Sequence, residues 1–163
     1  MVEDVGLGNG TILIRNKHAK LWRVNTEEIY EIAKENMEKN YPAQIISMES
    51  MIAELLDEEL QGCEVSCEKL GMYIITNESK YYGAATICYG DEIKMFSKCM
   101  KSDVAILPSS VHELILLPLS EEQNVNDLKD MVYEVNTNNV SDEDVLSYSV
   151  YVYRQEQDCI EIF

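Results

Sequence analysis

The sequence predicts an α+β fold, with about four helices packed on a mainly antiparallel or mixed sheet, in a single domain covering residues 1–163. Three observations support this prediction. The length suffices for one full hydrophobic core and leaves little room for two. The composition, 46% hydrophobic and 26% charged, is typical of a globular protein. Runs of period two and runs of period three to four follow each other along the chain, and adjacent hairpins favour an antiparallel sheet.

The first elements are a strand and a helix. Residues Thr11–Arg15 are β-branched and apolar, which favours a strand. Asn25 is a helix N-cap, because Glu28 stands three residues later as in a capping box. The helix is expected to end at Asn40 and to bury a stripe of Ile29, Ile32, Ala33 and Met37. Trp22 is also expected to pack into the core.

The next segment predicts a strand, a second helix and a hairpin. Residues Ala43–Ile46 form the strand, and Ser47 is the N-cap of the helix. The apolar stripe of that helix comprises Met48, Met51, Ile52, Leu55 and Leu56. Two β-rich runs follow, Met72–Thr76 and Tyr82–Tyr89, and the polar residues between them suit a hairpin loop.

A short helix and a second hairpin come next. Asp91 is expected to cap the helix, whose inner face carries Ile93, Phe96 and Met100. The strands Val104–Leu107 and Val111–Leu117 flank a turn that begins at Pro108.

The last part of the chain predicts a helix and two strands. The third helical stripe comprises Leu128, Met131, Val132 and Val135. Ser141 and Asp144 suit one further helical turn. Residues Tyr148–Tyr153 form a tyrosine-rich strand, and Ile160–Phe163 add a strand at the edge of the sheet.

The charge is unusual, because 30 acidic residues against 13 basic ones give a net charge of −17. Such a field repels phosphate backbones, so we expect no direct binding to nucleic acid or to an anionic membrane. The same charge attracts a basic partner. Neither a signal peptide nor a membrane-spanning run is visible, which predicts a cytoplasmic protein.

Cysteine and histidine patterns argue against a metal site or cofactor. The five cysteines form an odd set without CxxC spacing, which is typical of reduced thiols. Most of them are expected to be small core residues, and only Cys63 and Cys67 are close in sequence. The sequence therefore predicts no metal site and no cofactor.

The candidate binding surface consists of Asn77, Ser109, Ser110, His112 and Glu113. If residues 110–114 are extended, Ser110 and His112 project from one face about 7 Å apart. That spacing permits a serine and a histidine to approach each other. It identifies no third group and no oxyanion hole. Turn-forming serines and a hydrogen-bonded histidine explain the same residues without catalysis. Asn77 begins a polar loop that is either an ordinary turn or the mouth of a pocket.

Several stretches resemble an uncharacterised protein family of Gram-positive gut anaerobes, a domain of unknown function. The most specific is the stretch from Ile106 to Pro118, which contains Pro-Ser-Ser-Val-His-Glu. Others are residues 9–14, 41–43, 72–73, 76–77, 83–85, 135–136 and 145–147. The resemblance implies no activity. It implies that this chain is the C-terminal half of a longer protein, a short member of the family or a shortened form of a longer member. In the first case the missing N-terminal half is one expected partner.

Three functions remain open from the sequence. The first is a non-enzymatic binding or interaction module that meets a protein or a small ligand near Asn77, Ser110 and His112. The second is a hydrolase-like enzyme that uses Ser110 and His112. The third is an acidic inhibitor that mimics nucleic acid and blocks a basic protein.

Overall fold

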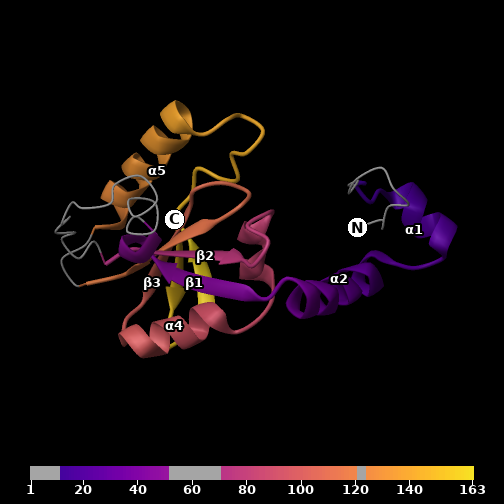
Figure 1. Ribbon diagram of the computed structural model, residues 1–163, viewed down its shortest axis with the longest axis horizontal. Coiled ribbons are helices and arrows are strands. Elements are labelled where there is room, and N and C mark those ends of the chain that lie inside the picture. Colours follow the sequence, from indigo (N-terminus) through magenta and orange to yellow (C-terminus); the bar gives the residue numbers. More distant parts are fainter. Residues whose placement is uncertain (1–11, 52–70, 121–123) are drawn as a thin grey trace, which may run out of the picture.

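Six strands form one antiparallel sheet (Figure 1). The computed structural model describes residues 12–51, 71–120 and 124–163. Across the sheet the strand order is β1-β2-β4-β3-β5-β6. The strands are β1 (Ala43–Ser47), β2 (Tyr73–Asn77), β3 (Val104–Pro108), β4 (Leu114–Pro118), β5 (Tyr151–Arg154) and β6 (Cys159–Ile162). The α+β prediction is confirmed, and every pair of neighbouring strands is antiparallel.

Helices precede, cover and connect the strands. They are α1 (Asn16–Trp22), α2 (Thr26–Asn40), α4 (Glu92–Met100), α5 (Val125–Asn139) and the 3₁₀ helix η1 (Gly83–Cys88). Residues 48–51 are also helical, which confirms the helix start predicted from the N-cap Ser47. The rest of that predicted helix lies outside the described residues. Within the described ranges, no helix is long and apolar enough to cross a membrane.

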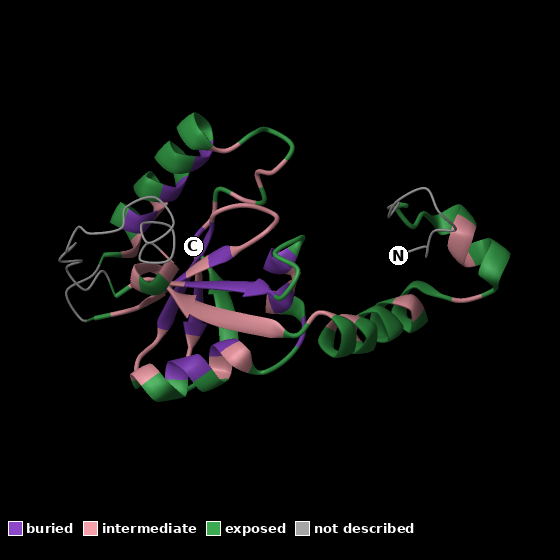
Figure 2. Ribbon diagram, viewed as in Figure 1, coloured by how far each residue is buried: buried purple, intermediate pink, exposed green. Residues whose placement is uncertain are grey.

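The core occupies both faces of the sheet. The central strand β3 is buried at all five positions, so its side chains alternate between two clusters. On one face Val104 and Ile106 pack with Phe96 of α4. On the other face Ala105 and Leu107 pack with the α5 residues Leu128 and Val132. Figure 2 shows the buried residues gathered along the sheet and on the inner sides of these two helices.

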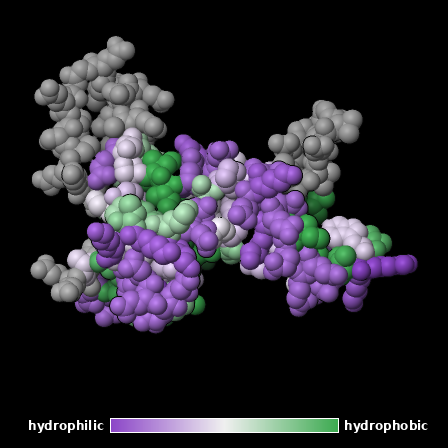
Figure 3. Space-filling view, turned by 90° about the horizontal axis from the view of Figure 1, so that it is seen from below, coloured by the Kyte–Doolittle hydropathy of each residue, from purple (hydrophilic) through white to green (hydrophobic). Residues whose placement is uncertain are grey.

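Residues 12–40, here called the arm, lead away from the sheet (Figure 1). The capping box of α2 is confirmed, because Glu28 N donates to Asn25 Oδ1 and Asn25 N donates to Glu28 Oε2, both at 2.8 Å. The prediction of a buried stripe on α2 is wrong, since none of its residues is buried and Ile32 is 56% exposed. Trp22 is 52% exposed, so its predicted place in the core is wrong too. Figure 3 shows hydrophobic side chains exposed among hydrophilic ones along the arm.

The predicted strand at Thr11–Arg15 is wrong for its described residues. Residues 12–15 have no regular structure, and helix α1 begins directly after them. Arg15 N donates to His18 Nδ1 at 3.1 Å at the start of this helix. A strand needs a neighbour to satisfy its backbone, and the arm lies away from the sheet.

The predicted strand Tyr82–Tyr89 is wrong, because η1 occupies most of it. Thr86 Oγ1 donates to the carbonyl of Gly83 at 2.8 Å and closes this short helix. The predicted hairpin partner of this segment, β2, pairs instead with β1 and β4. Both edges of β2 are thus occupied, and the segment has no open edge to join.

Two further predictions on β4 and α5 need correction. The strand predicted from Val111 begins only at Leu114. The inner face of α5 consists of Leu128, Val132 and Asn136, at a spacing of four residues. Met131 and Val135, predicted to be buried, are 45% and 39% exposed. The helical turn predicted at Ser141 and Asp144 is confirmed as a single turn, because Asp144 N and Val145 N both donate to the Ser141 carbonyl, at 2.9 and 3.2 Å.

Candidate functional site

The polar loop after β2 is held by the buried side chain of Asn77. Asn77 is fully buried, and its Nδ2 donates to the Tyr81 carbonyl at 3.0 Å. Its Oδ1 accepts from Ser79 Oγ at 2.8 Å and from Tyr81 N at 3.4 Å. The buried Asn77 side chain therefore fixes the conformation of the loop and is not exposed to a ligand.

The loop 109–113 between β3 and β4 is a hydrogen-bonded turn. Ser110 Oγ accepts from His112 N at 3.0 Å, and Ser110 N donates to the Glu113 carbonyl at 3.3 Å. Ser109 Oγ lies 3.5 Å from Glu113 Oε1. The extended geometry expected for Ser110 and His112 is therefore wrong, because local side-chain and backbone bonds favour a turn here.

The two loops meet at His112. Thr76 Oγ1 donates to the His112 carbonyl at 2.9 Å, and Tyr82 N donates to His112 Nδ1 at 3.1 Å. Because Nδ1 accepts, the neutral imidazole carries its proton on Nε2, which lies 3.4 Å from Asp144 Oδ1. Both ring nitrogens thus contact groups other than Ser110. Within the described part of the chain, serine and imidazole are not hydrogen-bonded to each other.

Three rings gather at this point, and with the Asp144 carboxylate we call them the aromatic cluster. Tyr81 and Tyr82 are in edge contact, with ring centroids 4.4 Å apart. The His112 ring lies 5.1 Å from Tyr81 and 5.6 Å from Tyr82. Tyr81 is 54% and Tyr82 49% exposed. A side-chain hydrogen bond with Tyr81 raises the pKa of Tyr82, so this ring is a neutral phenol at neutral pH.

The structure therefore brings together His112 and the neighbourhood of Asn77, as the sequence suggested, and adds residues that the sequence analysis missed. The sequence predicts a strand at Tyr82 and a helical turn at Asp144, and it places Tyr81 between the polar loop and that strand. The available signal was the Tyr81-Tyr82 pair beside a polar loop, where large rings are unusual. The arrangement presents aromatic surface beside a carboxylate, which is suited to binding a cationic group.

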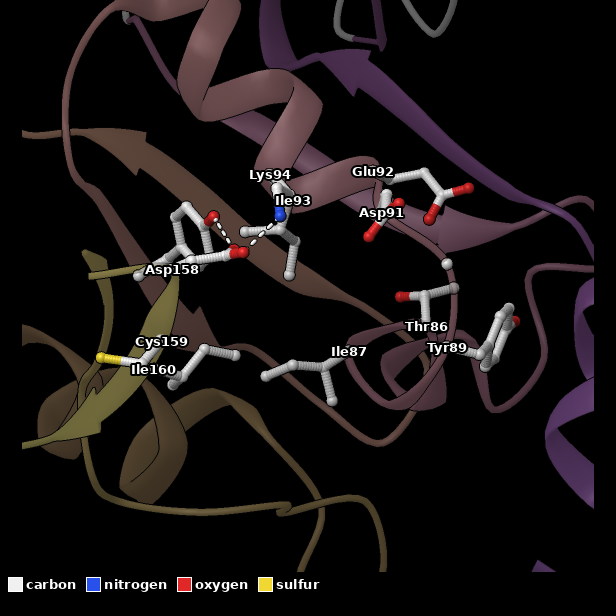
Figure 4. A pocket seen from close by; sticks show the side chains of 12 residues that line it. Thr86, Ile87, Tyr89, Asp91, Glu92, Ile93, Lys94, Asp158, Cys159 and Ile160 are labelled. Atoms are coloured by element: carbon white, nitrogen blue, oxygen red, sulfur yellow. Dashed lines mark hydrogen bonds and ion pairs between the residues drawn. The ribbon is translucent and has the colours of Figure 1, made fainter. Parts of the chain in front are cut away.

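A second candidate is a pocket of about 340 Å³ between α4, η1 and the β5–β6 turn (Figure 4). Ile87 and Ile160 form an apolar side, and Asp91 and Glu92 lie opposite. Lys94 pairs with Asp158, which also accepts from the Tyr153 hydroxyl at 2.6 Å. Oε2 of Glu92 is buried and has no hydrogen-bond partner among the described residues. The pocket is mixed in character, and its most ordered feature is the Tyr153–Asp158–Lys94 chain.

This chain of hydrogen bonds makes stability fall at alkaline pH. Burial, followed by the Asp158 hydrogen bond, raises the pKa of Tyr153 to about 12, while the unfolded value is about 10. A raised pKa contributes stability that is complete below pH ~10 and is lost as the pH rises through about 12. We therefore expect the free energy of unfolding to decline over this window, and to decline less in Tyr153→Phe. Urea unfolding between pH 9 and 12 measures this.

Tyr133→Phe is the matched control, because it removes an exposed tyrosine hydroxyl, and it should decline like the wild type. An equally steep decline in Tyr153→Phe would contradict the assignment.

Thiols and acidic groups give no metal site in the part of the chain that is described. No group of three His, Cys, Asp or Glu side chains is placed there to hold an ion. Cys88, Cys99 and Cys159 are free thiols and exposed, so their expected burial is wrong. Cys88 lies on η1, Cys99 on the outer side of α4 and Cys159 on the edge strand β6. At these three positions the side chain faces away from the core. Cys63 and Cys67 lie outside the described residues.

The fold and the site define an acidic α+β protein with a six-stranded antiparallel sheet and an exposed aromatic cluster at one end of β2. A family model matches residues 1–155 of the chain, so the protein belongs to DUF5688, a family of unknown function. The resemblance to an uncharacterised family is thereby confirmed. No curated protein and no solved structure matches the chain.

Proposed function

We propose that this protein is a non-enzymatic interaction module whose aromatic cluster binds a basic segment of a partner protein. The observation that carries the proposal is the exposure of Tyr81 and Tyr82, 54% and 49%, on a loop that buried Asn77 holds in place. Aromatic rings are large and rigid, and they are enriched at protein interfaces.

The backbone of this loop supports the proposal. Lys80 and Tyr82, on either side of Tyr81, have φ angles of +54° and +51°. A left-handed conformation costs a residue other than glycine roughly 1–2 kcal/mol, and such residues cluster at functional sites. In this loop the left-handed backbone conformation places the rings of Tyr81 and Tyr82 at the surface.

The charge around the rings favours a cationic ligand. Asp144 lies beside His112, and the chain as a whole carries a net charge of −17. An arginine or lysine side chain over a tyrosine face gains about 0.5–2 kcal/mol, and a nearby carboxylate adds to this. The acidic field raises the rate at which such a partner arrives.

The experiment is a selection of peptides followed by affinity measurements. A phage-displayed peptide library is selected on the wild-type protein, and enriched peptides are measured by fluorescence anisotropy at physiological salt. We expect arginine- or lysine-bearing peptides whose affinity falls about tenfold or more in Tyr81→Ala and in Tyr82→Ala, which keep the net charge.

Tyr30→Ala is the matched control, because Tyr30 is 49% exposed on α2, and its affinity should equal that of the wild type. Peptides that bind Tyr81→Ala and Tyr82→Ala as tightly as the wild type would overturn the proposal. Such a result would show that the net charge of the protein causes the binding without the two tyrosine rings.

The other assignments from the sequence stay predictions. They are the hydrolase that uses Ser110 and His112, the acidic inhibitor that mimics nucleic acid, and the cytoplasmic location. The placement of the chain as the C-terminal part of longer proteins from Gram-positive gut anaerobes is also a prediction.

A further inference from the structure

The start of the arm is basic and apolar, in contrast to the rest of the chain. Residues 12–26 contain four of the 13 basic residues and none of the 30 acidic ones, which leaves nine basic against 30 acidic residues elsewhere. Ile14, Leu21 and Trp22 are 51%, 77% and 52% exposed. The centroids of the His18 and Trp22 rings lie 5.7 Å apart on α1, and the two ring planes are tilted by 35°. We call residues 12–26 the basic arm face.

A second surface has the opposite charge and also exposes apolar side chains. On α5 and the segment after it, residues 124–148 contain six acidic residues and one basic residue. Met131, Tyr133 and Tyr148 are 45%, 62% and 49% exposed, and the two tyrosine rings lie 5.7 Å apart. Val135 and Leu146 are exposed as well. We call residues 124–148 the acidic α5 face.

The basic arm face and the acidic α5 face lie on opposite sides of the molecule (Figure 1). They cannot cover each other within one chain while α2 leads α1 away from the sheet. Exposed apolar patches of this kind mark sites of association. We propose that the basic arm face of one copy docks on the acidic α5 face of a second copy. The proposal uses neither Tyr81 nor Tyr82; the acidic α5 face shares Asp144 with the aromatic cluster, and the test below leaves Asp144 unchanged.

Charge complementarity identifies a second copy of this chain as the partner of each face. Four cations on the arm meet a face with a net charge of −5, where Asp127, Asp130 and Glu134 repeat along one helix. The apolar side chains of both faces leave water together on docking. If each copy gives its arm to the other, the same contact is made twice and the assembly closes as a symmetric dimer.

The test reverses the charge of each face separately and then mixes the two variants. Lys17→Glu/Lys20→Glu/Arg23→Glu changes the charge of the basic arm face from +4 to −2. Asp127→Lys/Asp130→Lys/Glu134→Lys changes the charge of the acidic α5 face from −5 to +1, and all six side chains are exposed. Mass is measured by light scattering during size-exclusion chromatography. We expect a wild-type dimer and a monomer for each variant alone. An equimolar mixture of the two variants should return to the dimer, because an acidic arm then meets a basic α5 face.

Lys98→Glu/Lys101→Glu is the matched control, since it reverses two exposed cations near the end of α4 and should leave the dimer intact. Dissociation of the wild-type dimer by high salt is also expected. A wild type that stays monomeric up to high micromolar concentration would overturn the proposal, and so would a mixture that stays monomeric.

Binding of a monomeric wild type to vesicles of phosphatidylcholine and phosphatidylserine would assign the arm to a lipid surface. Tyr81→Ala should not change the mass, so failure here is distinct from failure of the peptide-binding proposal.

Discussion

Replacing Gly83 by alanine is expected to lower the free energy of unfolding by about 3 kcal/mol, the upper end for an overpacked site. A Cβ atom there would lie 2.1 Å from Thr76 Oγ1 and 2.4 Å from the His112 carbonyl oxygen. It would also lie 2.9 Å from the backbone nitrogen of Asn77. Two of these three atoms belong to the backbone, so relief requires that a loop or β2 itself moves. Urea unfolding followed by circular dichroism measures the loss.

Gly71→Ala is the control for this prediction. Gly71 has a φ of +62°, and a Cβ there would meet no atom within 4 Å. Only the conformational cost of about 1 kcal/mol is therefore expected. Equal losses in the two variants would show that the close approach of Gly83 to Thr76 and His112 is not what makes glycine necessary. The Gly83 variant should also weaken peptide binding, because the movement reaches the aromatic cluster.

Replacing Asn136 by alanine is expected to cost roughly 2–4 kcal/mol, since the buried Pro108 carbonyl and the part-buried Ser147 carbonyl lose their donor. Asn136 is 2% exposed on the inner face of α5. Its Nδ2 donates to the Ser147 carbonyl at 2.9 Å and to the Pro108 carbonyl at 3.4 Å. One amide thus joins α5 to the end of β3 and to the segment before β5. Thermal and urea unfolding both report the change.

Two further variants identify the cause. Asn136→Asp keeps the shape and removes the donor, so we expect a loss at least as large, because a carboxylate would face the two carbonyls. Asn138→Ala changes an exposed asparagine of the same helix and should leave the stability within about 0.5 kcal/mol of the wild type. An Asn136→Ala variant as stable as Asn138→Ala would contradict the structural role assigned to this amide.

The candidate site was predictable only in part. His112 and Asn77 were selected from their polar loops, and the structure does bring those loops together. The residues that make the surface were missed because Tyr82 begins a β-rich run in the sequence and Tyr81 lies directly before it. Their exposure depends on an αL backbone and on a partner loop 30 residues away. No local pattern records such a partner.

Local patterns in the chain account for the elements whose signals lie within a few residues of each other. Asn25 and Glu28 set the start of α2, Asp91 marks the start of α4, and the uninterrupted apolar run from Val104 indicates a strand buried on both faces. Tertiary structure alone decided which elements those segments would meet. The neighbours of β2 are β1 and β4, so the segment after it became η1, and α2 left the sheet with its apolar stripe uncovered. Capping and periodicity act between neighbours in the chain, whereas strand pairing and burial depend on competition among contacts far apart in sequence.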